Sequence, residues 1–155
     1  MAEKKRRPSA VKAASAKSVP GLVGSISERD AGLPVAVIGA GPCVLAAAAA
    51  LEASGVRAIV YDRGCVASSI ASYPLYMTFF STAEKIAIAN VPFPIATDKP
   101  TRREALAYYR MVVQHLGLDV HQYEPVVQVW RRKQDYVIHS KPRGGDVVET
   151  KVRAV

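Results

Sequence analysis

The stretch that decides the fold is residues 34–42, Pro-Val-Ala-Val-Ile-Gly-Ala-Gly-Pro. Its apolar, β-branched run predicts a buried strand that stops at a Gly-x-Gly turn, and an alanine-rich segment of helical character follows at once. The next apolar run ends in Asp62, 23 positions after Gly39. Strand, turn, helix, strand and acid, in that order, form the arrangement that a nucleotide pyrophosphate needs.

Each residue of this motif has a physical task in such a site. Gly39 lets the chain turn tightly, and Gly41 lets backbone N–H groups approach the phosphates. Pro42 opens a helix whose N-terminus offers unpaired N–H donors and a partial positive charge. The Asp62 carboxylate can accept hydrogen bonds from ribose hydroxyls. Arg63 could lie against the adenine or the phosphates, although a solvent-exposed charge explains it equally well.

One position departs from the full G-x-G-x-x-G pattern. The third glycine would fall at position 44, where the chain has Val44. That glycine normally allows close packing of helix on strand, so a β-branched side chain should push the two apart. Two interpretations stay open, a tolerated variant with a slightly shifted helix and a weakened cofactor site.

The charge of the chain is concentrated at its start. The 155 residues carry a net charge of +8. Six Lys and Arg against Glu3 place +5 of that charge in residues 1–17, which leaves about +3 for the body. We therefore expect residues 1–32 to be a disordered basic tail, residues 33–155 to be one domain, and the chain to have no specific nucleic-acid partner. No apolar stretch is long enough for a signal or a membrane span, so the cytoplasm is the expected compartment.

The remaining elements are predicted from the spacing of apolar residues and from the turn and capping residues between them. We expect one parallel sheet, an antiparallel meander after it, and an aromatic-rich loop region at 63–100 that covers something. Thr101 and Glu104 predict a capping box that opens a helix ending at Gly117, and residues 81–84 resemble a second box. The expected strands are 35–38, 57–61, 118–121, 127–130, 136–138 and 147–152, and the expected long helices are 42–54 and 101–116. Because the chain stops inside an apolar run at Val155, we expect a truncated protein.

Four further blocks of sequence are more specific than this plan. They are Gly-Ala-Gly-Pro-Cys at 39–43, Ser-Tyr-Pro-Leu-Tyr-Met-Thr-Phe-Phe-Ser-Thr at 72–82, Val-Pro-Phe at 91–93, and Lys-Pro-Thr-Arg at 99–102 followed by Glu-Ala-Leu-Ala-Tyr-Tyr-Arg at 104–110. From about residue 35 to 155 the chain resembles the bacillithiol disulfide reductase family of thioredoxin-reductase-like, NADPH-dependent FAD oxidoreductases. Val44 differs from the glycine of that family.

The resemblance implies a fold, cofactors and a substrate. The fold would be α/β, a Rossmann-like FAD-binding βαβ parallel sheet with an antiparallel β-meander, here as the N-terminal part only. The cofactor would be FAD, with NADPH used by a full-length member, and the substrate a small-molecule disulfide such as bacillithiol disulfide. Whether the protein forms a homo-oligomer stays open.

Further candidate residues are Cys43 and part of the aromatic loop. A helix N-terminus stabilises a thiolate, and the resemblance implies that Cys43 takes part in thiol–disulfide chemistry; a small packing residue is the alternative. Tyr73, Met77 and Thr78 could border an isoalloxazine ring, or the loop could pack on its own core. Cys65 and the histidines at 115, 121 and 139 lack ligand spacing, which favours structural roles and predicts no metal site.

Two other functions compete with a disulfide reductase. A flavin monooxygenase shares the same N-terminal plan, and it would form peroxide rapidly from oxygen in place of disulfide turnover. A non-catalytic nucleotide-binding remnant, or a basic-tailed binding protein, comes from another class. Because no second Gly-x-Gly turn follows Gly41 in a strand-to-helix context, we expect these 155 residues alone to lack steady reductase activity.

Overall fold

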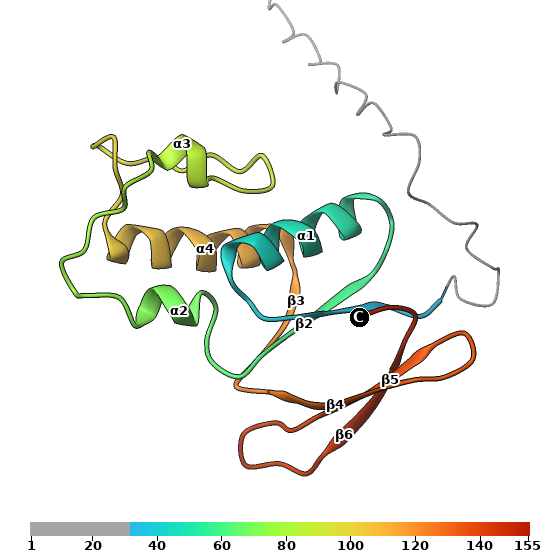
Figure 1. The fold of residues 1–155 in the computed structure, drawn as a ribbon. Helices are drawn as coiled ribbons and strands as arrows, with labels where there is room; N and C mark the ends of the chain where they lie inside the picture. The colour runs from blue at the N-terminus through green and yellow to red at the C-terminus, as the bar shows by residue number, and fades with distance from the viewer. Residues whose placement is uncertain (1–31) are drawn as a thin grey trace, which may run out of the picture.

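The computed structural model describes residues 32–155, so the expected disordered tail lies almost entirely outside the described residues. The order of elements is the one that the sequence predicts, with one additional helix turn, α2 (Figure 1). The elements are β1 (Val35–Ile38), α1 (Pro42–Ala53), β2 (Ala58–Asp62), α2 (Ser68–Ala71), α3 (Ala83–Ile86), α4 (Arg102–Leu116), β3 (Asp119–Gln122), β4 (Val126–Arg131), β5 (Tyr136–Ser140) and β6 (Val148–Val152).

The first sheet is parallel, as predicted, and β2 is its central strand. The order is β1-β2-β3, with Val37 opposite Val60 and Val60 opposite Val120. After β6 the chain returns to the free side of β1, where Ala36 N–H donates to the carbonyl of Ala154 at 3.0 Å. The second sheet is the predicted antiparallel meander, in the order β4-β5-β6.

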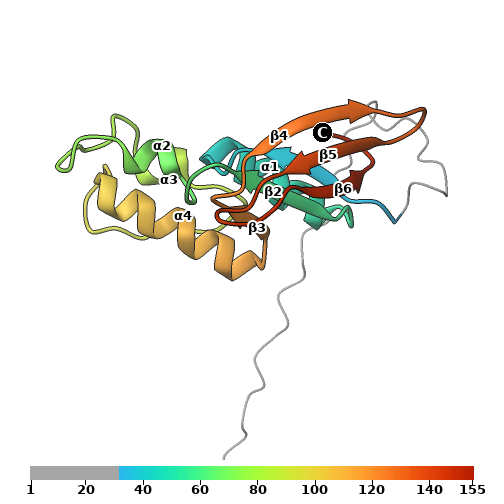
Figure 2. The same ribbon diagram turned by 90° about the horizontal axis from the view of Figure 1, so that it is seen from below.

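The molecule has three layers, and the parallel sheet is the middle one. Helices α1 and α4 cover one face of this sheet, and the meander lies against the other (Figures 1 and 2). Strand β2 alternates accordingly. Ala58 and Val60 belong to the core shared with α1 and α4, whereas Ile59 and Tyr61 pack with Ile138 and other residues of the meander. A strand buried on both faces must be apolar throughout, which explains the run Ala-Ile-Val-Tyr.

The two long helices differ in composition and in how their ends are capped. The alanines of α1 make it thin, so it can approach the sheet closely, and Ala48 and Ala49 are buried. Helix α4 begins with the predicted capping box, formed in both directions by Thr101 and Glu104, and ends at Gly117, whose φ is 63°. The second predicted box is wrong. Helix α3 has Thr82 as its N-cap and no side chain caps it; the N–H of Ala83 donates instead to the carbonyl of Asp98 at 3.0 Å.

Tyrosines of α4 anchor the long segment between α2 and α4. The Tyr108 hydroxyl donates to the carbonyl of Val91 at 2.8 Å and accepts from the N–H of Ile88 at 2.9 Å. Phe93 stacks on the Tyr108 ring with centroids 4.0 Å apart, and the Tyr109 hydroxyl donates to the carbonyl of Ile86. The predicted loop region therefore covers α4.

The same segment also carries exposed apolar side chains. Tyr76 is 91% and Phe80 is 90% exposed.

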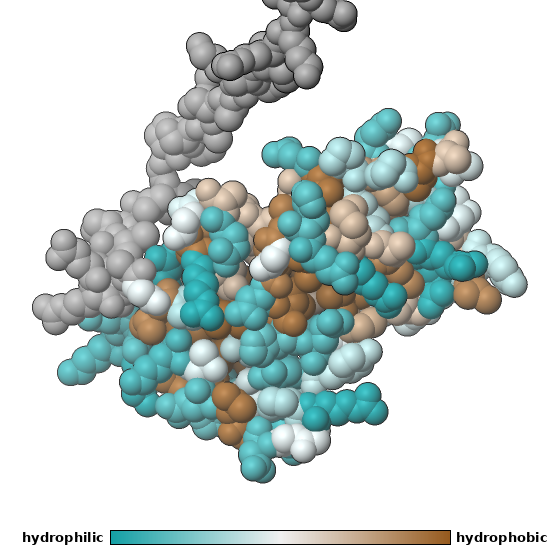
Figure 3. Space-filling model, turned by 180° about the vertical axis from the view of Figure 1, so that it is seen from behind, coloured by the Kyte–Doolittle hydropathy of each residue, from teal (hydrophilic) through white to brown (hydrophobic). Residues whose placement is uncertain are grey.

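Figure 3 shows apolar side chains gathered across the middle of the rear face, with hydrophilic side chains around them. Within residues 32–155, no helix combines the length and the apolar character that crossing a bilayer demands.

Packing between the two sheets should dominate the stability of the meander. Ile138 is 0% exposed, while Val129, its partner on β4, is 43% exposed. We expect Ile138→Ala to lower the free energy of unfolding by about 2–5 kcal/mol, because it leaves a cavity between the layers. Val129→Ala should cost less than about 1 kcal/mol. Urea unfolding measures both, and equal losses would contradict this arrangement of layers.

The α4 capping box should make stability depend on pH. The Thr101 N–H and, secondarily, its hydroxyl donate to the Glu104 carboxylate at 2.7 and 2.8 Å, which lowers the pKa of Glu104 from its ordinary 4.5. A carboxyl whose pKa is lower in the folded state stabilises the fold above its unfolded pKa, and this stabilisation is lost as the pH falls through the folded pKa.

We therefore expect Glu104→Gln to flatten the loss of unfolding free energy below pH 4.5, as followed by urea titrations at several pH values. Glu84→Gln, a change in the first turn of α3, is the control. A Glu104→Gln profile that keeps the wild-type slope would exclude the capping box as the cause.

Candidate functional site

A cavity of about 850 Å³ opens at the carboxyl ends of β1 and β2. In open parallel sheets this edge is where ligands bind. Four segments form the cavity: the turn after β1, the end of β2, helix α2 and the start of β4. Its lining residues are Ile38, Gly39, Gly41, Tyr61, Asp62, Arg63, Gly64, Ser68, Ser69, Ser72, Pro125 and Val126.

The Asp62 carboxylate ties two of these segments together. Oδ2 accepts from the N–H of Ala40 at 2.6 Å, in the middle of the Gly-x-Gly turn. Oδ1 accepts from the N–H of Gly64 at 2.6 Å and from the Ser68 hydroxyl at 3.4 Å. A carboxylate offers roughly four acceptor positions, so acceptor capacity remains on Oδ2. The residue predicted to bind a ribose thus also fixes the turn beside it.

The turn and the start of α1 present backbone rather than side chains to the cavity. Gly39 has a φ of 105°, which favours glycine, and the N-cap Gly41 has no side chain that could cap the helix. A Cβ built on Gly41 would meet nothing within 4 Å. The first-turn N–H groups of α1 are therefore not capped by a side chain, and open space lies over Gly41, as an anionic ligand requires.

Val44 lies beside this turn. Its Cγ2 is 3.6 Å from the position that a Cβ on Gly39 would take, which is ordinary van der Waals separation. Val44 packs against the core, and Leu45 next to it is fully buried. This packing favours the tolerated variant over a displaced helix, and the effect of Val44 on ligand affinity stays a prediction.

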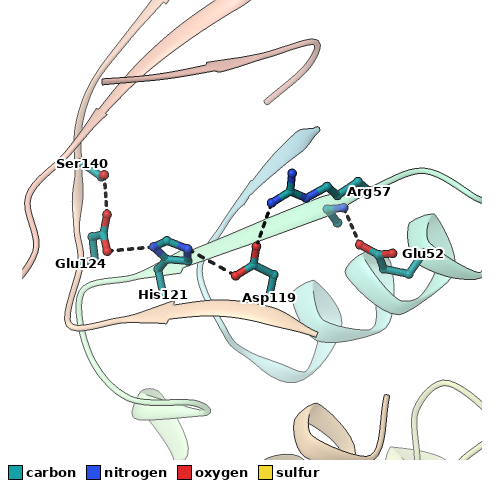
Figure 4. A network of polar contacts seen from close by, with 7 residues as sticks. Glu52, Arg57, Asp119, His121, Glu124 and Ser140 are labelled. Atoms are coloured by element: carbon teal, nitrogen blue, oxygen red, sulfur yellow. Dashed lines mark hydrogen bonds and ion pairs between the residues drawn. The ribbon is translucent and has the colours of Figure 1, made fainter. Parts of the chain in front are cut away.

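A polar network holds the far wall of the cavity, where Pro125 and Val126 lie (Figure 4). The buried Ser140 hydroxyl donates to Glu124 at 2.6 Å, and Glu124 contacts His121 Nδ1 at 2.9 Å. Glu124 N–H also donates to the carbonyl of Asp62 at 2.8 Å. The segment before β4 is therefore fixed both to β5 and to the end of β2.

The network continues along the sheet to the surface. His121 Nε2 is 3.3 Å from Asp119, which is 3.6 Å from Arg57, and Glu52 accepts from the N–H of Ala58 at 2.7 Å (Figure 4). Exposed pairs such as Arg57 and Asp119 contribute little stability. Tyr61 packs on the His121 ring with centroids 4.8 Å apart, and burial is the main cause that raises the pKa of Tyr61.

The structure brings only some of the predicted site residues together. Gly39, Gly41, Asp62 and Arg63 line the same cavity, and Pro42 begins the helix that points its N-terminus there. The three aromatic-loop candidates, Tyr73, Met77 and Thr78, are absent from the lining of this cavity.

Backbone contacts with the start of α4 fix that part of the loop. The carbonyl of Met77 accepts from Arg102 N–H at 2.8 Å, and Thr78 forms an isolated bridge with Thr101. The Arg102 guanidinium in turn donates to the carbonyls of Ile70 and Ala71 at the end of α2. The start of α4 therefore positions this part of the loop.

Cys43 is exposed in the first turn of α1. On α4, burial and, secondarily, the neighbouring Tyr108 raise the pKa of Tyr109 to about 12, and Cys43 contributes least. Cys65 is half-buried and free. Among residues 32–155, no three His, Cys, Asp or Glu side chains converge as a metal site would require.

Part of the cavity was not predicted from the sequence. Ser68, Ser69 and Ser72 come from α2, which begins after Ala67 in the left-handed conformation with a φ of 55°. The cluster of serines after Asp62 could have indicated a polar wall. Pro125 and Val126 could be found only from the packing of the meander on the parallel sheet.

Comparison with known proteins gives the family. Residues 36–150 match the family model of the pyridine nucleotide-disulphide oxidoreductases. The chain belongs to this family. Bacilliredoxin reductase of Bacillus subtilis is 47% identical over 78 residues, which are 50% of this chain and 24% of that protein.

Solved structures agree with this assignment. The bacillithiol disulfide reductase of Bacillus cereus superposes with a TM-score of 0.76 at 36% identity, over 78% of this chain and 37% of its own. A flavin monooxygenase of Stenotrophomonas maltophilia, a Q193R H194T mutant, superposes with a TM-score of 0.67 at 25% identity, over 79% of this chain and 36% of its own. The predicted fold and the resemblance to bacillithiol disulfide reductases are confirmed. The chain spans about a quarter to two fifths of the length of these relatives.

Loss of the Asp62 carboxylate should destabilise the cavity edge before any ligand is considered. We expect Asp62→Ala to cost about 2 kcal/mol of unfolding free energy, because the N–H groups of Ala40 and Gly64 lose a charged acceptor. Asp62→Asn keeps one acceptor oxygen and should cost less. Ser69→Ala, in the same cavity but exposed, should change stability by less than about 0.5 kcal/mol. We call the hydrogen bonds of Asp62 to the N–H groups of Ala40 and Gly64 the Asp62 clamp. If chemical denaturation finds Asp62→Ala as stable as wild type, the Asp62 clamp does not contribute to stability.

Proposed function

We propose that the cavity binds the ADP portion of FAD. The observation that carries the proposal is the Asp62 clamp, with a carboxylate held across a glycine turn beside a helix start that no side chain caps. Gly39, Gly41 and the start of α1 at Pro42 would receive the pyrophosphate. The remaining acceptor capacity of Asp62 would take a ribose hydroxyl, and Arg63 would lie at the adenine end with Pro125 and Val126.

In this proposal the full-length protein is an NADPH-dependent flavoprotein that reduces a low-molecular-weight disulfide, such as bacillithiol disulfide. Membership in the family supports it, together with 36% identity to a bacillithiol disulfide reductase. Bound FAD would supply two-electron transfer between the nicotinamide and the disulfide. Cys43, exposed at the start of α1, is the proposed thiol of this chain, and Tyr73, Met77 and Thr78 are the proposed neighbours of the flavin ring. A cytoplasmic location belongs to the same proposal.

A flavin monooxygenase is the second candidate, because such an enzyme has the same fold over this region. The two differ in what happens to the electrons. A monooxygenase passes them to oxygen, whereas a reductase passes them to a disulfide. The higher identity to the bacillithiol disulfide reductase, 36% against 25%, favours the reductase.

The ribose assignment of Asp62 can be tested with a matched pair of ligands. NAD and NADP differ only in the 2′-phosphate, which would meet the Asp62 carboxylate. We expect calorimetry on the 155-residue chain to show FAD binding, and NADP to bind about ten-fold or more weakly than NAD, because like charges would be juxtaposed. Asp62→Ala should narrow the difference between NAD and NADP.

Ser69→Ala, which lines the cavity without a bond to Asp62, is the control and should keep the wild-type preference. A purified chain that retains FAD would also absorb visible light, where the polypeptide does not. Tight NADP binding that Asp62→Ala leaves unchanged would overturn the ribose assignment. Absence of any FAD, NAD or ADP binding by folded protein would overturn the proposal itself.

A further inference from the structure

A second, smaller cavity lies next to the nucleotide cavity. It has a volume of about 370 Å³ and shares Arg63 and Pro125 with the larger one. Its other lining residues come from the connection between β3 and β4 and from the turn that joins β5 to β6: Tyr123, Lys141, Pro142, Arg143 and Gly144. Three of its seven lining residues are cations, and none is acidic.

Backbone hydrogen bonds fix the three segments that form this cavity. Tyr123 N–H donates to the carbonyl of Gly64 at 2.9 Å, and Lys141 N–H donates to the carbonyl of Pro125 at 3.0 Å. In the turn, Gly145 N–H donates to the carbonyl of Pro142 at 3.0 Å. Backbone hydrogen bonds therefore hold the segments that carry these cations, which form one hydrogen-bonded framework, called the frame below.

Tyr123 is held in an uncommon conformation at the centre of this frame. Its φ is 56°, in the left-handed region, which costs free energy for a residue with a side chain. The Arg143 guanidinium lies over its ring, 5.8 Å from the centroid, and such an aromatic contact orients the guanidinium.

The three cations have no acidic partner nearby. Across residues 32–155, no carboxylate forms an ion pair with Arg63, Lys141 or Arg143 within 4.0 Å. The described residues thus place three positive charges, none of them in an ion pair, around one small cavity, although the body of the protein carries a modest net charge.

We propose that this cavity binds a phosphate group of a ligand other than the dinucleotide. Two arginine forks and one ammonium match the charge and the several oxygens of a phosphate dianion. The volume of about 370 Å³ suits one compact anion with a small attached group. A nucleic acid would instead need a longer basic track to follow its backbone. The phosphate can come from free inorganic phosphate or from a phosphomonoester.

The site can be tested by titrating the folded 155-residue chain with inorganic phosphate and with phenyl phosphate, while amide NMR signals are followed. Sodium chloride at equal ionic strength is the control for screening. We expect saturable shifts of the amides of Gly64, Tyr123 and Gly144, and affinity about ten-fold or more lower in Lys141→Ala/Arg143→Ala, because charged hydrogen bonds are lost. The matched variant Arg132→Ala/Lys133→Ala removes the same charges from the β4–β5 turn and should bind like wild type.

The two ligands distinguish the source of the phosphate. Tighter binding of phenyl phosphate identifies a phosphomonoester, and equal binding identifies free phosphate. Shifts that chloride reproduces, shifts confined to the Gly39–Val44 turn, or affinity retained in the double variant would overturn the site. If the alanine variant unfolds, Lys141→Gln/Arg143→Gln repeats the test with longer side chains. Because Arg63 and Pro125 border both cavities, the titration uses chain without bound FAD, as shown by the absence of visible absorbance, so that failure of this site and failure of the FAD proposal are distinguished.

Discussion

The carboxylate of Asp62 is the interaction on which this site depends. Its oxygens accept from the backbone of Ala40, which belongs to the turn after β1, and of Gly64, which follows β2. These two segments are not neighbours in sequence, and the parallel pairing of β1 with β2 alone leaves their loops free. A short charged hydrogen bond on each side converts two loops into one rigid edge. A nucleotide would then bind to a preformed surface and lose less free energy to ordering the protein.

That edge exists because β2 is buried on both faces. Its alternate residues face the helices and the meander, so β2 cannot shift along its neighbours without placing its side chains in the wrong layer. The meander fixes the other wall of the cavity through Glu124, which contacts His121 and Ser140. A charged group in this half-buried position is costly unless its oxygens are satisfied. Both Glu124 oxygens have partners, which accounts for a polar bridge between two apolar layers.

Much of this arrangement follows from local sequence, and the exceptions have a common cause. The βαβ unit, the capping box at Thr101 and the meander were predicted because each depends on residues close together in the chain. Helix α2 was missed since it is a single turn that follows a left-handed alanine. The predicted box at residues 81–84 was wrong because the N–H at the start of α3 bonds to the carbonyl of Asp98, which is distant in sequence. Pro125 and Val126 were missed because only the packing of one sheet on the other places them at the cavity.

The predicted site residues also fall into two groups, those positioned by local structure and those positioned by contacts between distant segments. Gly39, Gly41, Asp62 and Arg63 meet at one cavity because the parallel pairing of β1 with β2 places the ends of both strands at the same edge of the sheet. The position of Met77 and Thr78 is set instead by residues 100–102, through backbone bonds from Pro100 and Arg102 and through the Arg102 guanidinium on α2. The pyrophosphate and ribose part of a flavin site would thus be specified by residues 33–62, whereas the adenine end would also need Pro125 and Val126, and the ring end would depend on how α4 docks. A substitution at Arg102 would therefore displace Met77 and Thr78 while the hydrogen bonds of Asp62 to Ala40 and Gly64 stay intact.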